Sequence, residues 1–140
     1  MNWLDYCISC KNWCCHHESP YASKDELLRL GVNKITCNKK GSCIFLDSHG
    51  KCKTYKNRPF ECKIFPIDIQ DINGSLYWVI WNVCPAYELL NANMLIKQYE
   101  NTLLKEMPPG FVRDYINYHK DNQPKKYSTE AFKVVKRLFA

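Results

Sequence analysis

The sequence lacks the features that place a chain in a membrane or send it out of the cell. Its longest apolar stretches, Ile44–Leu46 and Leu76–Trp81, fall far short of the roughly 20 residues that a membrane-spanning helix needs. The first residues, Met1–Cys7, have neither a basic start nor an apolar core, so we expect no signal peptide. We therefore expect no membrane partner and a cytoplasmic location, where thiols stay reduced.

Glycine is also scarce, with five residues in 140. The chain has no GxGxxG sequence, no glycine-rich phosphate loop and no GxSxG nucleophile motif. These absences argue against a nucleotide-binding loop and a serine nucleophile. A cysteine–histidine nucleophile pair stays open because Cys14–His17 lie together, although metal ligation explains the same residues more economically.

Cysteine, by contrast, is abundant, with nine residues. The number is odd, and a disulfide between the adjacent Cys14 and Cys15 would be sterically poor. A reducing compartment also disfavours disulfides, so we favour a metal centre over a disulfide framework or scattered core thiols. A chain this short buries only a modest part of its surface, so a bound metal would help to stabilise it.

The cysteines fall into two groups. The first, Cys7-Ile-Ser-Cys10-Lys-Asn-Trp-Cys14-Cys15, holds four cysteines within nine residues. Its CxxC pair lets two sulfurs converge on one metal while backbone amides donate to them. In the second group Cys43, Cys52 and Cys62 are too widely spaced to form a site alone, and they become a site if they fold back onto the first group. Cys84, before Pro85, lies at the start of a predicted helix, where the helix dipole favours a thiolate.

The two groups resemble the YkgJ-type cysteine-cluster family, described as zinc- or iron-chelating proteins. The family pattern is CxxCxxCC, then CxxL, then CxxYxxRPxxCxxF, then a later cysteine. This chain carries Cys43-Ile-Phe-Leu46 and Cys52-Lys-Thr-Tyr55-Lys-Asn-Arg58-Pro59-Phe60-Glu61-Cys62-Lys-Ile-Phe65, with one extra residue between Cys10 and Cys14. The resemblance covers Cys7 to Cys84 and implies eight metal ligands: Cys7, Cys10, Cys14, Cys15, Cys43, Cys52, Cys62 and Cys84. Cys37 has no place in the pattern, and we interpret it as a buried thiol.

Three other residues could take part in the centre: Arg58, His16 and His17. Arg58 could support a cofactor by donating to cluster sulfurs, or bind an anionic substrate, or simply pair with Glu61 or a carbonyl; we favour support of the cluster. His16 and His17 directly follow Cys15, and imidazole is a good zinc ligand. Eight thiols already fill two tetrahedral sites, so we interpret both histidines as solvated or packing residues.

The whole net charge of +6 lies in one stretch, Lys34–Lys63, where eight basic residues face only Asp47 and Glu61. Such a patch could attract nucleic acid, as a basic zinc module would. A divalent metal with four thiolates carries a charge of about −2, which interleaved lysines would offset. We favour this compensation over nucleic-acid binding.

The ligand set leaves the metal open between zinc and iron. Eight thiolates suit two four-cysteine zinc sites, whereas an iron–sulfur cluster needs four of them. The Cys84-Pro85 step and a wider relation to the flagellin lysine methylases, which are associated with an iron–sulfur centre, favour iron slightly. We predict a metal-binding protein whose centre is structural, stores metal or transfers electrons. The alternative is an iron–sulfur-dependent enzyme acting in redox chemistry or protein methyl transfer, with a redox partner or protein substrate; no catalytic residue is assigned.

The predicted fold is a single α+β domain over residues 1–140. Its cysteine-rich half, 1–84, is organised by metal and contains short β-hairpins, and 85–140 is helical and packs against it. A capping box at Ser23 and Glu26 predicts a helix that ends at Gly31. Asn73-Gly74 predicts a hairpin between strands Ile67–Ile72 and Ser75–Trp81.

The remaining elements are predicted from weaker patterns. Short strands are expected at Ile35–Cys37, Ser42–Leu46 and Cys52–Tyr55. Helices are expected from Pro85 to Met107 and over Phe111–His119. Ser128 is expected to cap a last helix with Phe132, Val135, Leu138 and Phe139 on one face.

Overall fold

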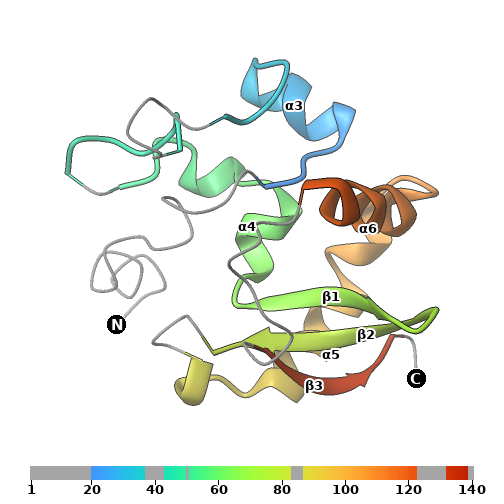
Figure 1. The fold of residues 1–140 in the computed structure, drawn as a ribbon. Helices are drawn as coiled ribbons and strands as arrows, with labels where there is room; N and C mark the ends of the chain where they lie inside the picture. Colours follow the sequence, from blue (N-terminus) through green and yellow to red (C-terminus); the bar gives the residue numbers. More distant parts are fainter. Residues whose placement is uncertain (1–19, 37–42, 50, 83–86, 123–131, 139–140) are drawn as a thin grey trace. The chain divides into compact units, whose positions relative to one another are not determined.

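The structure, a computed structural model, describes residues 20–36, 43–49, 51–82, 87–122 and 132–138. It contains helices and a three-stranded antiparallel sheet, which confirms a mixed α+β fold (Figure 1). The chain divides into two compact units, Met1–Lys63 and Ile64–Ala140, and each is described by itself. The sequence predicts a change from a cysteine-rich to a helical region after Cys84, whereas the boundary between the two units follows Lys63. The single domain over 1–140 stays a prediction. None of the helices in the described ranges is long and apolar enough to cross a membrane.

The first unit contains helix α3, Lys24–Leu30, which begins and ends as predicted. The Ser23 hydroxyl accepts from the Glu26 amide at 3.3 Å, and the Glu26 carboxylate accepts from the Ser23 amide at 3.0 Å. Gly31 adopts φ 71°, and its amide donates to carbonyls of the last turn, which ends the helix. Both local predictions are confirmed because each depends on residues within one helical turn.

The described residues between Cys43 and Asn57 contain no regular strand, so the prediction of short strands there is wrong. They contain isolated bridge residues, among them the antiparallel pair Leu46 and Cys52, followed by the 3₁₀ helix η1, Tyr55–Asn57. No strand continues beyond Thr54, because the Asn57 amide donates to the Thr54 carbonyl at 2.8 Å and closes a turn. Residues 37–42 of the predicted strands lie outside the described residues.

The second unit is built on a sheet of β1, Ile67–Ile72, β2, Ser75–Trp81, and β3, Phe132–Arg137, in the order β1-β2-β3. The β1–β2 hairpin is confirmed with the predicted boundaries. Asn73 and Gly74 have φ angles of 54° and 87°, the two positive values that a type I′ turn needs.

Replacing Gly74 with alanine is expected to lower the free energy of unfolding by about 1 kcal/mol. A Cβ at this position would meet nothing within 4 Å, so the cost comes only from holding alanine at positive φ. Urea unfolding followed by tryptophan fluorescence measures the change. Asn73→Gly is the control, since glycine accepts positive φ and stability should stay close to wild type. Equal stability of Gly74→Ala and wild type would contradict the turn assignment.

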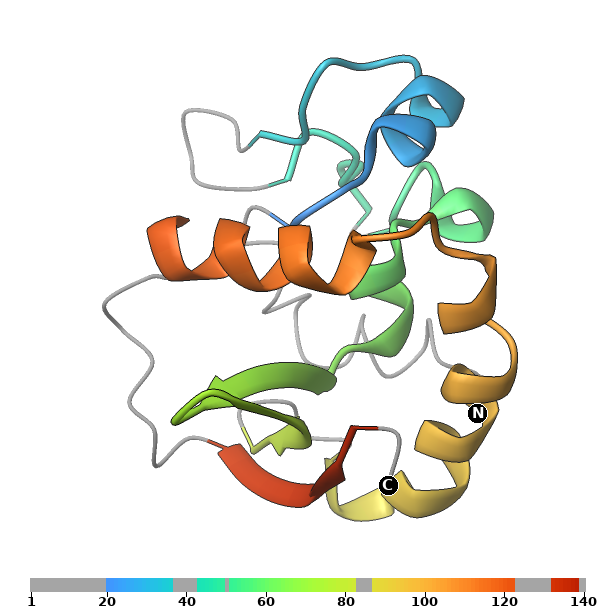
Figure 2. The same ribbon diagram turned by 90° about the vertical axis from the view of Figure 1, so that its right-hand side faces the viewer.

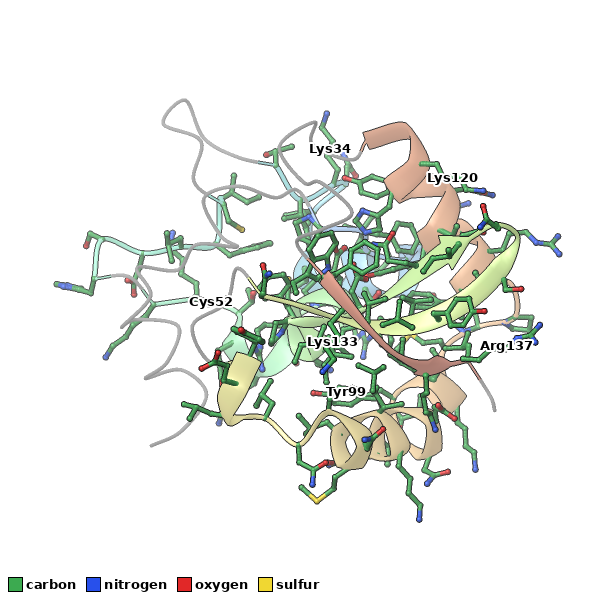
Figure 3. The ribbon with its side chains drawn as sticks, turned by 60° about the horizontal axis from the view of Figure 1, so that its bottom comes forward. Lys34, Cys52, Tyr99, Lys120, Lys133 and Arg137 are labelled. Carbon is green, nitrogen blue, oxygen red and sulfur yellow. The ribbon has the colours of Figure 1, made fainter. Side chains whose placement is uncertain are left out.

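The prediction of a last helix is wrong over residues 132–138, because they form the edge strand β3 and its continuation. β3 pairs antiparallel with β2, and the Phe132 ring contacts Trp81 edge-on at 5.1 Å between centroids. The register shifts between Trp78 and Val79, which pair with Lys136 and Val134, so Val135 is an extra residue on β3, as in a β-bulge. Figure 3 shows Lys133 and Arg137 on this strand. Ser128 and Phe139 lie outside the described residues.

The predicted long helix from Pro85 to Met107 is instead three shorter pieces: η2, Tyr87–Leu89, α5, Ala92–Asn101, and η3, Leu104–Glu106. Asn91 restarts the helix because its side chain accepts from the Met94 amide at 3.1 Å. Thr102 leaves helical geometry, with φ −121° and ψ −78°, and so ends α5. The following helix, α6, spans Phe111–Asn122 and confirms the helix predicted for Phe111–His119.

Helices α5 and α6 cover opposite faces of the sheet. Asp68 and Ile69 are neighbours in β1 and point to opposite faces, and Ile69 pairs with Trp78. Asp68 bonds the Tyr115 hydroxyl of α6, whereas Trp78 donates to Glu100 of α5 at 2.8 Å. Figure 2 shows both helices around the sheet. The sheet is therefore buried on both faces, with Trp78 and Tyr115 fully enclosed.

One buried carboxylate, Asp68, ties this unit together. Its Oδ1 accepts from the Tyr115 hydroxyl and from the Ile69 amide, the latter at 2.7 Å. Its Oδ2 accepts from the Trp81 indole at 2.9 Å and from the Gln70 amide group at 3.1 Å. Charged side chains are rarely buried unless their oxygens are hydrogen-bonded, and both Asp68 oxygens are.

Candidate metal centre

Three of the eight predicted ligands lie in described residues: Cys43, Cys52 and Cys62. All three belong to the first unit, and each is half-buried. The other five predicted ligands lie outside the described residues: Cys7, Cys10, Cys14, Cys15 and Cys84. Cys37, His16 and His17 lie outside them too.

The loop from Cys43 to Cys52 is held by its own hydrogen bonds. The Leu46 amide donates to the Cys43 carbonyl at 3.0 Å, and Leu46 pairs with Cys52 across the bridge. In the loop, the Asp47 carboxylate accepts from the Lys51 amide at 2.9 Å and from the His49 amide at 2.8 Å. The Lys51 amide is the main cause that lowers the pKa of Asp47 below its ordinary value. The backbone beside two predicted ligands is thus fixed by bonds within the chain.

Cys52 carries a free thiol with a polar neighbour. Its Sγ lies 3.5 Å from the Thr54 hydroxyl oxygen. A thiolate has no proton to give, so with a metal-bound Cys52 the hydroxyl would be the donor. Hydrogen bonds to ligating sulfurs stabilise their negative charge and tune a bound metal.

Cys62 lies on the short helix α4, Phe60–Ile64. Arg58 holds the backbone that leads into this helix. The Arg58 guanidinium donates to the Tyr55 carbonyl at 2.8 Å and to the Cys62 carbonyl at 3.3 Å. It also lies 4.0 Å over the Tyr55 ring, within the range of a cation–π contact. Arg58 therefore bonds carbonyls, as one of the sequence alternatives had it, and holds the backbone that carries Cys62. Contact between Arg58 and a metal-bound sulfur stays a prediction.

Two buried carboxylates near Cys62 were not connected with the centre by sequence reasoning. Glu26, 4% exposed, accepts from the Phe60 amide at 2.6 Å, and Glu61, 5% exposed, accepts from the Tyr21 amide at 2.5 Å. The sequence identified Glu26 only as part of a capping box, which uses one of its two oxygens. The second carboxylate oxygen, which the capping box leaves without a donor, indicated that Glu26 could accept another hydrogen bond. The sequence could not show that the donor is the amide of Phe60, 34 positions away.

The donor set fits a soft metal, because thiolates are preferred by zinc and by iron–sulfur clusters. Within the described ranges, no three histidine, cysteine or acidic side chains gather closely enough to hold a metal ion. The sequence predicts that Cys43, Cys52 and Cys62 are too widely spaced to form a site alone, and the eight-cysteine ligand set stays a prediction.

The described part of the cysteine-rich region therefore holds three half-buried thiols on a backbone with its own hydrogen bonds. The family model of the CxxCxxCC proteins, described as a "putative zinc- or iron-chelating domain", matches residues 6–89, more than half of the chain. The chain belongs to this family. The resemblance found in the sequence is confirmed, and with it a metal as the ligand class.

One curated relative also matches. The uncharacterized protein MJ0661 of Methanocaldococcus jannaschii is 33% identical in a 98-residue alignment, and the match covers 54% of this chain. The match spans about half of that relative's own length, 52%. No solved structure matches.

Proposed function

We propose that this chain holds an iron–sulfur cluster, in preference to zinc, through cysteines drawn from the set of eight between Cys7 and Cys84. The family match carries the proposal of a metal centre, because residues 6–89 include all eight cysteines, and the Cys84-Pro85 step favours iron over zinc. The hydrogen-bonded backbone around Cys52 and Cys62 supports it, since a preformed scaffold lowers the entropy lost when ligands gather on a metal.

The distribution of charge supports a thiolate centre over a nucleic-acid surface. Lys51, Lys53 and Lys56 are exposed and alternate with the predicted ligands Cys52 and Cys62 along the chain. Several thiolates on one metal leave a negative charge that such lysines offset. The centre's role is structural, storage or electron transfer, and a cytoplasmic location would keep its thiols reduced.

The deciding experiment is anaerobic purification of the full chain followed by metal and acid-labile sulfide analysis. We expect a coloured protein with iron and sulfide in comparable amounts. A colourless protein with stoichiometric zinc would overturn the iron–sulfur assignment and leave a thiolate metal site. A folded protein without metal, insensitive to chelator, would overturn the whole proposal.

A further inference from the structure

We infer that Glu26 and Glu61 are positioning residues of the metal centre, an inference that rests on the proposed function. Each carboxylate accepts from a backbone amide far away in sequence, Glu26 from Phe60 and Glu61 from Tyr21. Together they form a clasp, which we define as these two hydrogen bonds. The clasp joins the start of α3 to the start of α4.

The clasp acts where the two cysteine groups must meet. Glu61 directly precedes Cys62, and Tyr21 follows Cys15 by six residues in the sequence. Six residues reach at most about 20 Å, so a Tyr21 backbone fixed beside Glu61 limits how far the first group can lie from the second. Without the clasp, the closure of a loop of roughly 40 residues would oppose metal binding.

Glu26 serves two helix starts at once. One carboxylate oxygen accepts from Ser23 in the capping box of α3, and the other accepts from Phe60, the first residue of α4. The first amides of a helix have no partner within it, so Glu26 satisfies one such group in each helix. Its negative charge also suits the positive end of both helices. Losing Glu26 would therefore free α4, and with it Cys62, from α3.

The probe is Co²⁺ alone, added anaerobically to the metal-free full chain and followed by its thiolate charge-transfer absorption. Glu61→Ala and Glu26→Ala are expected to weaken Co²⁺ binding by about 10- to 100-fold, the usual effect of losing a residue that orients ligands. Asp25→Ala is the matched control, since Asp25 is exposed beside Glu26 and binding should equal that of wild type.

Two further variants separate positioning from other roles. Glu61→Gln keeps an acceptor for the Tyr21 amide, so it should recover most of the affinity that Glu61→Ala loses. Ser23→Ala removes the hydroxyl that accepts from the Glu26 amide but leaves the bond between Glu26 and Phe60, so binding should stay near wild type. Amide NMR shifts of Tyr21 and Phe60 report the clasp directly in each folded variant.

Each outcome decides between the readings. Wild-type affinity in both alanine variants overturns the positioning role and leaves the metal centre intact. Equal losses in Glu61→Gln and Glu61→Ala indicate that Glu61 ligates the metal itself, which overturns its positioning role. Equal losses in Ser23→Ala and Glu26→Ala trace the effect to α3 stability and overturn the role of Glu26. Absence of thiolate absorption in wild type overturns the inference that the clasp positions a thiolate metal site, while the proposed iron–sulfur cluster is decided separately by the iron and sulfide analysis.

Discussion

Replacement of Cys62 by alanine is expected to weaken metal binding by about a hundredfold. Structural zinc sites with four ligands bind with roughly 10–16 kcal/mol, so one ligand contributes about 3 kcal/mol. At about 1.4 kcal/mol for each factor of ten, this loss corresponds to about two orders of magnitude. Cys62 is chosen because Arg58 and the clasp both fix its backbone, so relaxation of α4 cannot easily bring another donor into its place.

The matched control is Cys37→Ala, which removes the one cysteine that the family pattern leaves out. We expect it to bind as much metal as wild type, with the same resistance to a competing chelator. Metal content after dialysis against graded chelator, measured on both variants in parallel, gives the comparison. An intact metal content in Cys62→Ala, or an equal loss in Cys37→Ala, would contradict the assignment of the eight ligands.

Replacement of Asp68 by alanine is expected to lower the free energy of unfolding by about 3 kcal/mol or more. The change leaves the Tyr115 hydroxyl and the Trp81 indole N–H buried without their acceptor, and each such group costs roughly 1–3 kcal/mol. Because Asp68 bonds α6 to the sheet, the loss should separate the helix from the strands early in unfolding. Urea titration followed by tryptophan fluorescence and far-ultraviolet circular dichroism measures the effect.

Asp114→Ala serves as the control for this second prediction. Asp114 is exposed in the first turn of α6, where its interaction with the helix dipole contributes at most about 1 kcal/mol. A change in Asp68→Ala no larger than that in Asp114→Ala would show that the buried network is not what holds the second unit together. Asp68→Asn keeps one acceptor oxygen and should fall between the two.

Local patterns predicted the parts of the fold that depend on neighbouring residues. The capping box at Ser23 and Glu26 and the turn at Asn73-Gly74 were confirmed with their boundaries. In both cases the hydrogen-bonding groups or the positive φ angles lie within four residues, so no distant contact is needed to fix them.

Some apolar patterns are compatible with both a helix and a strand, or with both one helix and several. In these segments the tertiary structure decided between the alternatives. Phe132–Arg137 has apolar spacing that suits a helix, yet it forms a strand because β2 offers a hydrogen-bonding edge and Trp81 offers a ring to contact. The stretch from Pro85 to Met107 carries helical spacing, but the side chain of Asn91 caps a new helix and divides it.

The sequence by itself determined the family of this protein, and with it a metal as the ligand class, because the cysteine spacing around an Arg-Pro step is the pattern of that family. Only the tertiary structure decided how those donors are supported. It placed Arg58 on two carbonyls and turned the spare oxygen of Glu26 toward Phe60, 34 residues away. A carboxylate's partner is set by which amide the folded chain brings within reach, and no local pattern encodes that distance. The number and order of the cysteines are set by the sequence. The burial of Cys43, Cys52 and Cys62, and the hydrogen bonds that hold the backbone near them, are set by the fold.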